Sequence, residues 1–176
     1  MGGWLQDFWE GLGSDFTSVP GPAAAARVSL RLLLAAILGG LIGFQRERVG
    51  KAAGLGTHML VALASALIVM LPEQAGLTSA DLSRVMQGLV TGIGFLGAGV
   101  ILKLSEERQI KGLTTAATIW LTAGLGMAVG LGRLLLAVLG TGLALIILFT
   151  HRRLADWLER ETGRPPPPPD QVRKAP

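Results

Sequence analysis

Between Lys111 and Arg133 the chain reads GLTTAATIWLTAGLGMAVGLG, which is residues 112–132. This stretch contains no charged side chain. An α-helix rises 1.5 Å per residue, so about 20 apolar residues cross the roughly 30 Å hydrocarbon core of a bilayer. The stretch therefore predicts a transmembrane helix, and the rest of the chain has to fit a membrane fold.

Four further intervals lack charged side chains. They are residues 32–45, 52–72, 85–102 and 134–151. The first is short, but it becomes long enough when it is extended back to Val28, with Arg31 near one end where its stem can reach the headgroups. We predict an all-α, polytopic membrane bundle of about five transmembrane helices. The expected spans are 28–45, 55–72, 84–102, 112–131 and 133–150.

The composition agrees with a membrane protein. Half of the 176 residues are hydrophobic and 16% are charged, whereas a soluble domain carries nearer a quarter of charged residues. The 25 glycines suit helices that approach each other closely in lipid. Cysteine is absent, which excludes disulfides and thiolate chemistry. The net charge of +4 is explained by topology, so we expect no nucleic-acid partner.

Lysine and arginine are distributed unevenly between the two ends of the predicted spans. Most of the 16 basic residues follow the first, third and fifth spans. Basic residues are enriched on the cytoplasmic side of membrane proteins. We therefore expect the N-terminus outside and the C-terminus in the cytoplasm.

Two terminal regions flank the membrane domain, which we place at residues 27–151. Residues 1–26 are expected to form an interfacial amphipathic segment, because Trp4, Phe8 and Trp9 recur at helical spacing. Residues 152–176 are expected to be a basic, proline-rich cytoplasmic tail. The run of prolines in this tail is a stiff spacer or, alternatively, a ligand for an SH3-like domain.

A file of polar residues enters the third predicted span from the expected outer side. Asp81, Arg84, Gln87 and Thr91 are three or four residues apart, which places them along one side of a helix. Polar residues within a span indicate a functional pathway or ligand site, and Asp81 is a possible metal ligand. The alternative is structural, with Asp81 capping the helix and pairing with Arg84.

Glycines dominate the middle of the same span. The five that we single out are Gly88, Gly92, Gly94, Gly97 and Gly99. A GxGxxG match occurs among them, but it lies inside an apolar span without the strand that a dinucleotide fold needs. Two interpretations are open: a smooth face against which another helix packs, or a helix that unwinds and offers carbonyls to an ion.

Threonines mark the fourth span, where Thr114, Thr115, Thr118 and Thr122 share one face. We expect their hydroxyls to bond helix carbonyls or a neighbouring helix.

A polar motif lies between the first two spans, on the expected cytoplasmic side. It comprises Arg46, Glu47, Thr57 and His58. The arginine can bind lipid headgroups or a protein partner, and a single histidine is a poor metal site. No catalytic set of residues occurs in the sequence, so we do not expect an enzyme or a resident cofactor.

These landmarks, in this order, resemble the membrane domain of the MgtC/SapB family. The matching segments are 41–47, 53–58, 92–101 and 112–120, together with Asp81 and Arg84. The family usually has an acidic residue where this chain has Gln45 and an arginine where it has Gly56. The resemblance implies a multi-pass protein of the bacterial inner membrane, linked to growth under magnesium limitation and, in pathogens, to virulence.

Two functions are compatible with these features. The first is a modulator that binds other membrane proteins, such as a transporter or the ATP synthase. The second is a transporter or channel for magnesium or another cation, with Mg²⁺ as its ligand or signal. A single carboxylate per chain is little for Mg²⁺, which demands oxygen ligands. We therefore favour the modulator, and we expect a homo-oligomer in either case.

Overall fold

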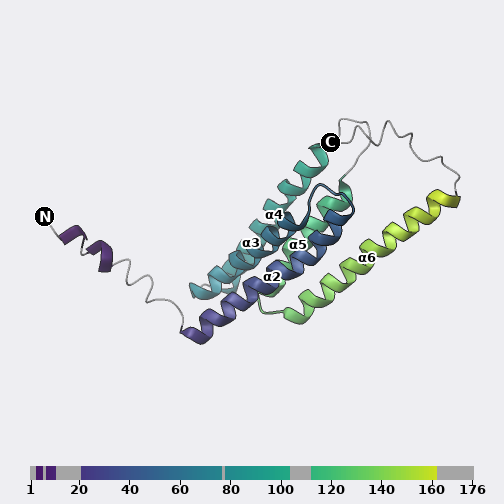
Figure 1. Ribbon diagram of the computed structural model, residues 1–176. Coiled ribbons are helices and arrows are strands. Elements are labelled where there is room, and N and C mark those ends of the chain that lie inside the picture. Colours follow the sequence, from purple (N-terminus) through teal and green to yellow (C-terminus); the bar gives the residue numbers. More distant parts are fainter. Residues whose placement is uncertain (1–2, 6, 11–20, 77, 104–111, 162–176) are drawn as a thin grey trace. The chain divides into compact units, whose positions relative to one another are not determined.

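The structure is a computed structural model, and it describes residues 3–5, 7–10, 21–76, 78–103 and 112–161 (Figure 1). Within these residues all regular secondary structure is helical. The long helices are α2 (Pro22–Arg48), α3 (Leu55–Gln74), α4 (Ser79–Lys103), α5 (Leu113–Gly130) and α6 (Leu134–Glu161). Residues 3–5 and 7–10 are also helical. The predicted all-α class is confirmed.

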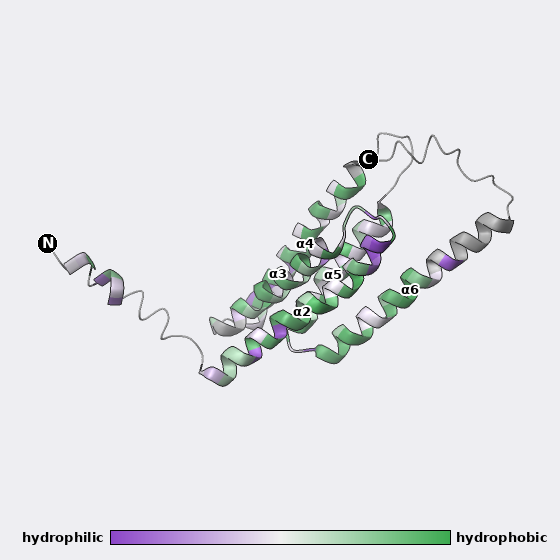
Figure 2. Cartoon of the chain, viewed as in Figure 1, coloured by the Kyte–Doolittle hydropathy of each residue, from purple (hydrophilic) through white to green (hydrophobic). Residues whose placement is uncertain are grey.

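Among the described residues, four helices are long and apolar enough to cross a bilayer. The crossing segments are Pro22–Arg48, Leu55–Pro72, Ser79–Ile101 and Leu113–Gly130. In α6 the apolar part is shorter and runs from Leu134 to Thr150. Colouring by hydropathy shows long apolar stretches along these helices, with hydrophilic residues gathered near the ends of α2 (Figure 2). The chain is therefore a multi-pass membrane protein, while the fifth crossing and the orientation stay predictions.

Several helices extend beyond the predicted spans: α4 begins five residues earlier, at Ser79, and α2 and α6 extend further still. α2 begins at Pro22, where proline suits the first helical position because its missing N–H has no partner there, and four alanines continue the helix. α6 continues past the predicted span as far as Glu161. The proline run and the rest of the C-terminal tail, together with residues 11–20, lie outside the described residues.

The chain divides into two compact units, residues 1–141 and residues 142–176. All contacts discussed below lie in the first unit. There α2, α3 and α5 pack against one another, and α4 packs against α3 and α5 (Figure 1). A cluster of small and aliphatic side chains forms the centre of this packing. Its buried members are Ala35, Leu38, Ala62, Ala66, Val129 and Ala137.

Small residues set the helix separations in this core. A Cβ built on Gly39 would be 2.7 Å from the Ala62 side chain, and one built on Gly130 would be 2.7 Å from the Ala66 carbonyl oxygen. Lipid tails are as apolar as leucine, so helices in a bilayer associate through close van der Waals packing. Glycine and alanine permit that packing here, and they position the polar side chains at the ends of α2.

Candidate functional site

A buried polar cluster lies where the end of α2 meets the beginnings of α3 and α5. Its centre is Arg46, which is only 4% exposed. The Arg46 guanidinium donates a 3.0 Å hydrogen bond from Nη2 to Thr115 Oγ1. Arg46 Nε has no partner in the part of the chain that the structure describes. A buried charge is costly unless it is paired and fully hydrogen-bonded. Burying the Arg46 guanidinium therefore costs free energy, which indicates a role beyond packing.

His58 contributes a second unpaired atom to the same cluster. The residue is completely buried, and its Nδ1 lies 2.9 Å from the Gly54 carbonyl oxygen. A carbonyl only accepts hydrogen bonds, so Nδ1 carries the proton and a neutral ring presents a lone pair at Nε2. His58 Nε2 is buried and has no hydrogen-bond partner in the described chain.

Gln45 is the third member, and sequence reasoning noted it only as a departure from the family pattern. It is 7% exposed, and its Oε1 is buried with no partner among the described residues. Gln45 directly precedes Arg46 on α2. A Cβ built on Gly43, one turn before Arg46, would be 3.0 Å from His58 Cβ, which brings this end of α2 against His58. We name Gln45, Arg46, His58 and Thr115 the corner cluster.

Glu47 stabilises the corner from outside. Its Oε2 accepts a 2.7 Å hydrogen bond from the backbone N–H of Leu55, the first residue of α3. The first N–H groups of a helix lack intrahelical acceptors and carry partial positive charge, so a carboxylate there satisfies both needs. Thr57, from the same predicted motif, is exposed. Arg46, Glu47 and His58 thus share one junction, whereas Thr57 faces outward.

Arg31, near the other end of α2, also caps a neighbouring helix. Its Nη1 donates a 3.1 Å hydrogen bond to the carbonyl oxygen of Gly130, the last residue of α5. Cationic groups are favourable at helix C-termini because the last carbonyls lack partners. The sequence analysis expected Arg31 to reach the lipid headgroups. The bond to Gly130 was not expected, because no sequence spacing links these two residues.

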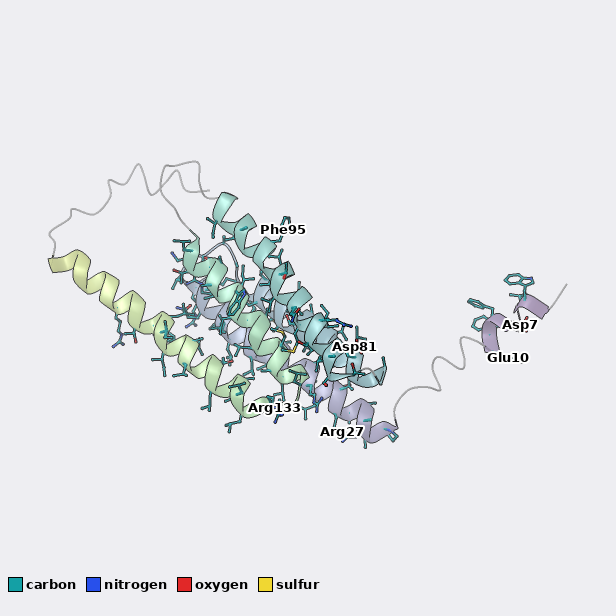
Figure 3. The ribbon with its side chains drawn as sticks, turned by 180° about the vertical axis from the view of Figure 1, so that it is seen from behind. Asp7, Glu10, Arg27, Asp81, Phe95 and Arg133 are labelled. Carbon is teal, nitrogen blue, oxygen red and sulfur yellow. The ribbon has the colours of Figure 1, made fainter. Side chains whose placement is uncertain are left out.

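The polar file on α4 lies along an uncovered surface. Arg84 and Asp81 form an ion pair at 3.3 Å, with their side chains 79% and 36% exposed. Asp81 Oδ2 also accepts hydrogen bonds from the hydroxyl and the backbone N–H of Thr78, at 2.6 and 3.2 Å. Gln87 is exposed, and the Thr91 hydroxyl bonds the Gln87 carbonyl oxygen at 2.9 Å. This geometry matches the structural alternative for Asp81, close to the helix start (Figure 3).

Most of the glycines of α4 meet nothing in the described chain. Apart from the nearby backbone of α4 itself, no described atom lies within 4 Å of a Cβ built on Gly88, Gly92, Gly94 or Gly99. A Cβ on Gly97 would be 3.6 Å from Ala116 Cβ. α4 is helical without interruption from Ser79 to Lys103, so the unwound helix is not observed. Phe95, on the same helix, is 80% exposed and points away from the bundle (Figure 3).

The threonines of α5 separate into two groups. Thr115, Thr118 and Thr122 are buried, whereas Thr114 is exposed. Thr118 bonds the Thr115 carbonyl oxygen at 2.8 Å, and Thr122 bonds the Thr118 carbonyl oxygen at 2.7 Å. These two threonines are internally satisfied, and Thr115 reaches across to α2. Among the described residues, no group of three or more His, Cys, Asp or Glu side chains could hold a metal ion.

Comparison with known proteins identifies relatives over most of the chain. Residues 32–157 match the model of the MgtC family. SrpB of Synechococcus elongatus is 45% identical over 78% of this chain and 82% of its own length. YhiD of Escherichia coli K12, named as a candidate magnesium transporter, is 42% identical over 73% of this chain. MgtC of Salmonella typhimurium is 41% identical over 74% of this chain.

The chain spans only part of two of these relatives, namely 62% of YhiD and 54% of MgtC. No solved structure matches the chain. The family match nevertheless extends from α2 into α6 and includes the corner cluster, the polar file and the glycine-rich helix. On these grounds the chain belongs to the MgtC family.

Proposed function

We propose that this protein is a non-enzymatic modulator of other membrane proteins in the bacterial inner membrane, acting during adaptation to magnesium limitation. It would bind its target, such as a transporter or the ATP synthase, within the bilayer. The link to magnesium limitation is supported by the relative YhiD, which is named as a candidate magnesium transporter. For this chain we propose modulation and not transport.

The observation that carries this proposal is the uncovered glycine surface of α4. Gly88, Gly92 and Gly99 have no neighbour in the described chain. A glycine face offers lipid tails little contact area, whereas it allows a second helix to approach closely. Such a face therefore favours another protein over lipid as its neighbour, and that neighbour is a second copy of the chain or the modulated target.

The charges of the corner cluster support the same conclusion. Arg46 is a buried cation at one end of the three-helix core. A positive charge in a low-dielectric environment repels a passing cation strongly, since Coulomb energies rise as the dielectric constant falls. A magnesium pathway past Arg46 would therefore be energetically unfavourable.

The alternative is a cation transporter in which Asp81 collects the ion, and the exposed carboxylate at the start of α4 is the feature that favours it. Both carboxylate oxygens, however, already accept bonds from Thr78 and Arg84. A Mg²⁺ ion keeps its hydration shell unless several oxygen ligands replace it. One carboxylate per chain, with both oxygens already hydrogen-bonded, cannot replace this hydration shell effectively.

Magnesium flux into proteoliposomes separates the two functions. The purified wild-type protein is compared with Asp81→Asn and with empty vesicles, after folding is verified by circular dichroism. We expect no flux above empty vesicles for either protein. Flux that wild type supports and Asp81→Asn loses would overturn the modulator and make Asp81 a pathway residue.

A further inference from the structure

The corner cluster contains a buried charge that bonds no carboxylate among the described residues. The side-chain hydrogen bond of Arg46 goes from its guanidinium to the neutral Thr115 hydroxyl. The neighbouring carboxylate of Glu47 is directed to the backbone N–H of Leu55, at 2.7 Å. A guanidinium in such a position requires a negative partner more than it requires another neutral acceptor. Within the part of the chain that the structure describes, the bonds of the corner cluster supply no such charge.

The helix end beside Arg46 is itself suited to an anion. Thr115 lies in the first turn of α5, whose N-cap is Gly112, a residue without a side chain that could cap the helix. The first N–H groups of a helix point outward and carry about half a positive charge together. Through its bond to Thr115, Arg46 is held against this first turn. The Arg46 guanidinium and the positive end of the α5 dipole therefore both attract an anion to this place.

The remaining unpaired atoms define the chemistry of the anion. Arg46 Nε is a donor, whereas His58 Nε2 and Gln45 Oε1 are both acceptors. All three are buried and have no hydrogen-bond partner among the described residues. A halide or a fully ionised oxyanion would satisfy the donor and leave both acceptors unpaired. An oxyanion that also carries a hydroxyl can accept from Arg46 and donate to an acceptor.

We infer that the corner cluster and the first turn of α5 bind an oxyanion of the phosphate class that carries a hydroxyl. Hydrogen phosphate has this character, and so does the phosphomonoester headgroup of phosphatidic acid. The two are separate sources of one chemistry. This site does not depend on the modulator proposed above, because it lies at the α2–α3–α5 junction and not on the surface of α4.

Thermal unfolding of the full-length protein in detergent, with added inorganic phosphate, tests the site directly. We expect Tm to rise in a saturable manner with phosphate, because a ligand that binds only the folded state stabilises it. Sulfate at equal ionic strength has the same shape but no proton at neutral pH, and it should raise Tm much less. Equal shifts with both anions would contradict the proposed hydroxyl contact.

Three variants locate the site. Arg46→Gln should abolish the phosphate shift, and Arg46→Lys should bind about tenfold or more weakly, as loss of one hydrogen bond to a charged group implies. Arg48→Gln is the matched control: it removes the same charge two positions along, where Arg48 lies 4.4 Å over the exposed Phe44 ring. It should keep the full shift. A phosphate shift that persists in Arg46→Gln would overturn the site.

Gln45→Glu provides a test in which we expect the folded state to become more stable. It places a carboxylate beside Arg46 and so supplies the missing counter-charge internally. We expect this variant to unfold at a higher temperature than wild type without phosphate and to lose the phosphate shift. A Gln45→Glu protein that still binds phosphate as wild type does would exclude charge compensation as the basis of binding.

The two sources are distinguished in vesicles. Wild type and Arg46→Gln are reconstituted into phosphatidylcholine alone and into phosphatidylcholine with phosphatidic acid. A Tm rise from phosphatidic acid that requires Arg46 identifies a lipid headgroup, whereas a rise only from soluble phosphate identifies the free ion. If neither addition moves Tm in wild type, the inference fails.

Discussion

The Arg46 guanidinium of α2 is joined to the Thr115 hydroxyl of α5 by a 3.0 Å hydrogen bond. A second bond between the same helices runs from Arg31 to Gly130. The two bonds are the same fifteen positions apart on each helix, residues 31 to 46 and residues 115 to 130, which is about 22 Å. They therefore fix both the antiparallel direction and the register of α2 against α5, one near each end.

Thr115→Val should destabilise the protein by about 1–3 kcal/mol. Valine keeps the shape of threonine but leaves the Nη2 donor of buried Arg46 without an acceptor, and an unsatisfied buried group costs that amount. Thr114→Val is the control, because Thr114 is exposed on the neighbouring position of the same helix. Unfolding in mixed micelles measures both. Equal losses of stability would show that the cross-helix bond is unimportant.

Removing the Glu47 carboxylate should loosen the start of α3. We expect Glu47→Ala to cost about 1.5–3 kcal/mol, the value of a hydrogen bond to a charged group. Glu47→Gln keeps an acceptor for the Leu55 N–H and loses only the interaction of charge with the helix dipole, about 0.3–1 kcal/mol. Hydrogen exchange at the first amides of α3 reports the effect locally. Faster exchange in Glu47→Ala than in Glu47→Gln is expected, and the reverse order would contradict a capping role.

Alanine at Gly43 and at Gly92 should have opposite effects. A Cβ on Gly43 would be 2.8 Å from the Gly54 carbonyl oxygen and from Leu55 Cα, so α2 and α3 would have to separate, at about 1–3 kcal/mol. A Cβ on Gly92 would meet no described atom, and alanine there should stabilise α4 by about 0.5–1 kcal/mol through lower backbone entropy.

Unfolding of the two alanine variants is measured in dilute detergent, where chains are monomeric. A destabilised Gly92→Ala monomer would mean that this face contacts another part of the chain. A Gly43→Ala protein as stable as wild type would mean that α2 and α3 can separate without loss.

The lengths of the charge-free apolar intervals predicted the helices well, because apolar character is a local property of the sequence. The charge-free interval around Trp120 corresponds to α5 within a residue or two at each end. The starts of α2 and α4 and the end of α6 were underestimated, because the predicted spans stop near charged side chains. An α-helix continues through Arg27, Asp81 and Arg153 once its backbone bonds are satisfied.

The corner cluster was harder to predict. The motif around Arg46 and His58 was recognised, but its burial follows from the approach of Gly43 to the start of α3, which is a contact between helices. Likewise, Arg31 and Gly130 are 99 positions apart in sequence, and no periodicity links them. Pairings across helices depend on register, and register cannot be obtained from one sequence by spacing alone.

A single cysteine on α4 should identify what covers its glycine face. The chain contains no cysteine, so Gly92→Cys introduces a unique thiol into an otherwise unreactive protein. In native membranes we expect oxidation to give a disulfide-linked dimer if a second copy packs there, or a thiol-directed cross-linker to capture a different membrane protein. Leu60→Cys is the control, since Leu60 is 66% exposed on α3 and lies outside the glycine face.

The comparison between the two cysteines decides the role of α4. A second helix can approach Gly92 closely because no side chain intervenes, whereas cross-linking needs two reactive groups held within reach. Gly92→Cys should therefore cross-link at least about tenfold faster than Leu60→Cys, as expected when a partner raises the effective concentration of the reacting group. Equal slow rates at both positions would mean that lipid covers α4, and the interaction surface on which the modulator function depends would be lost.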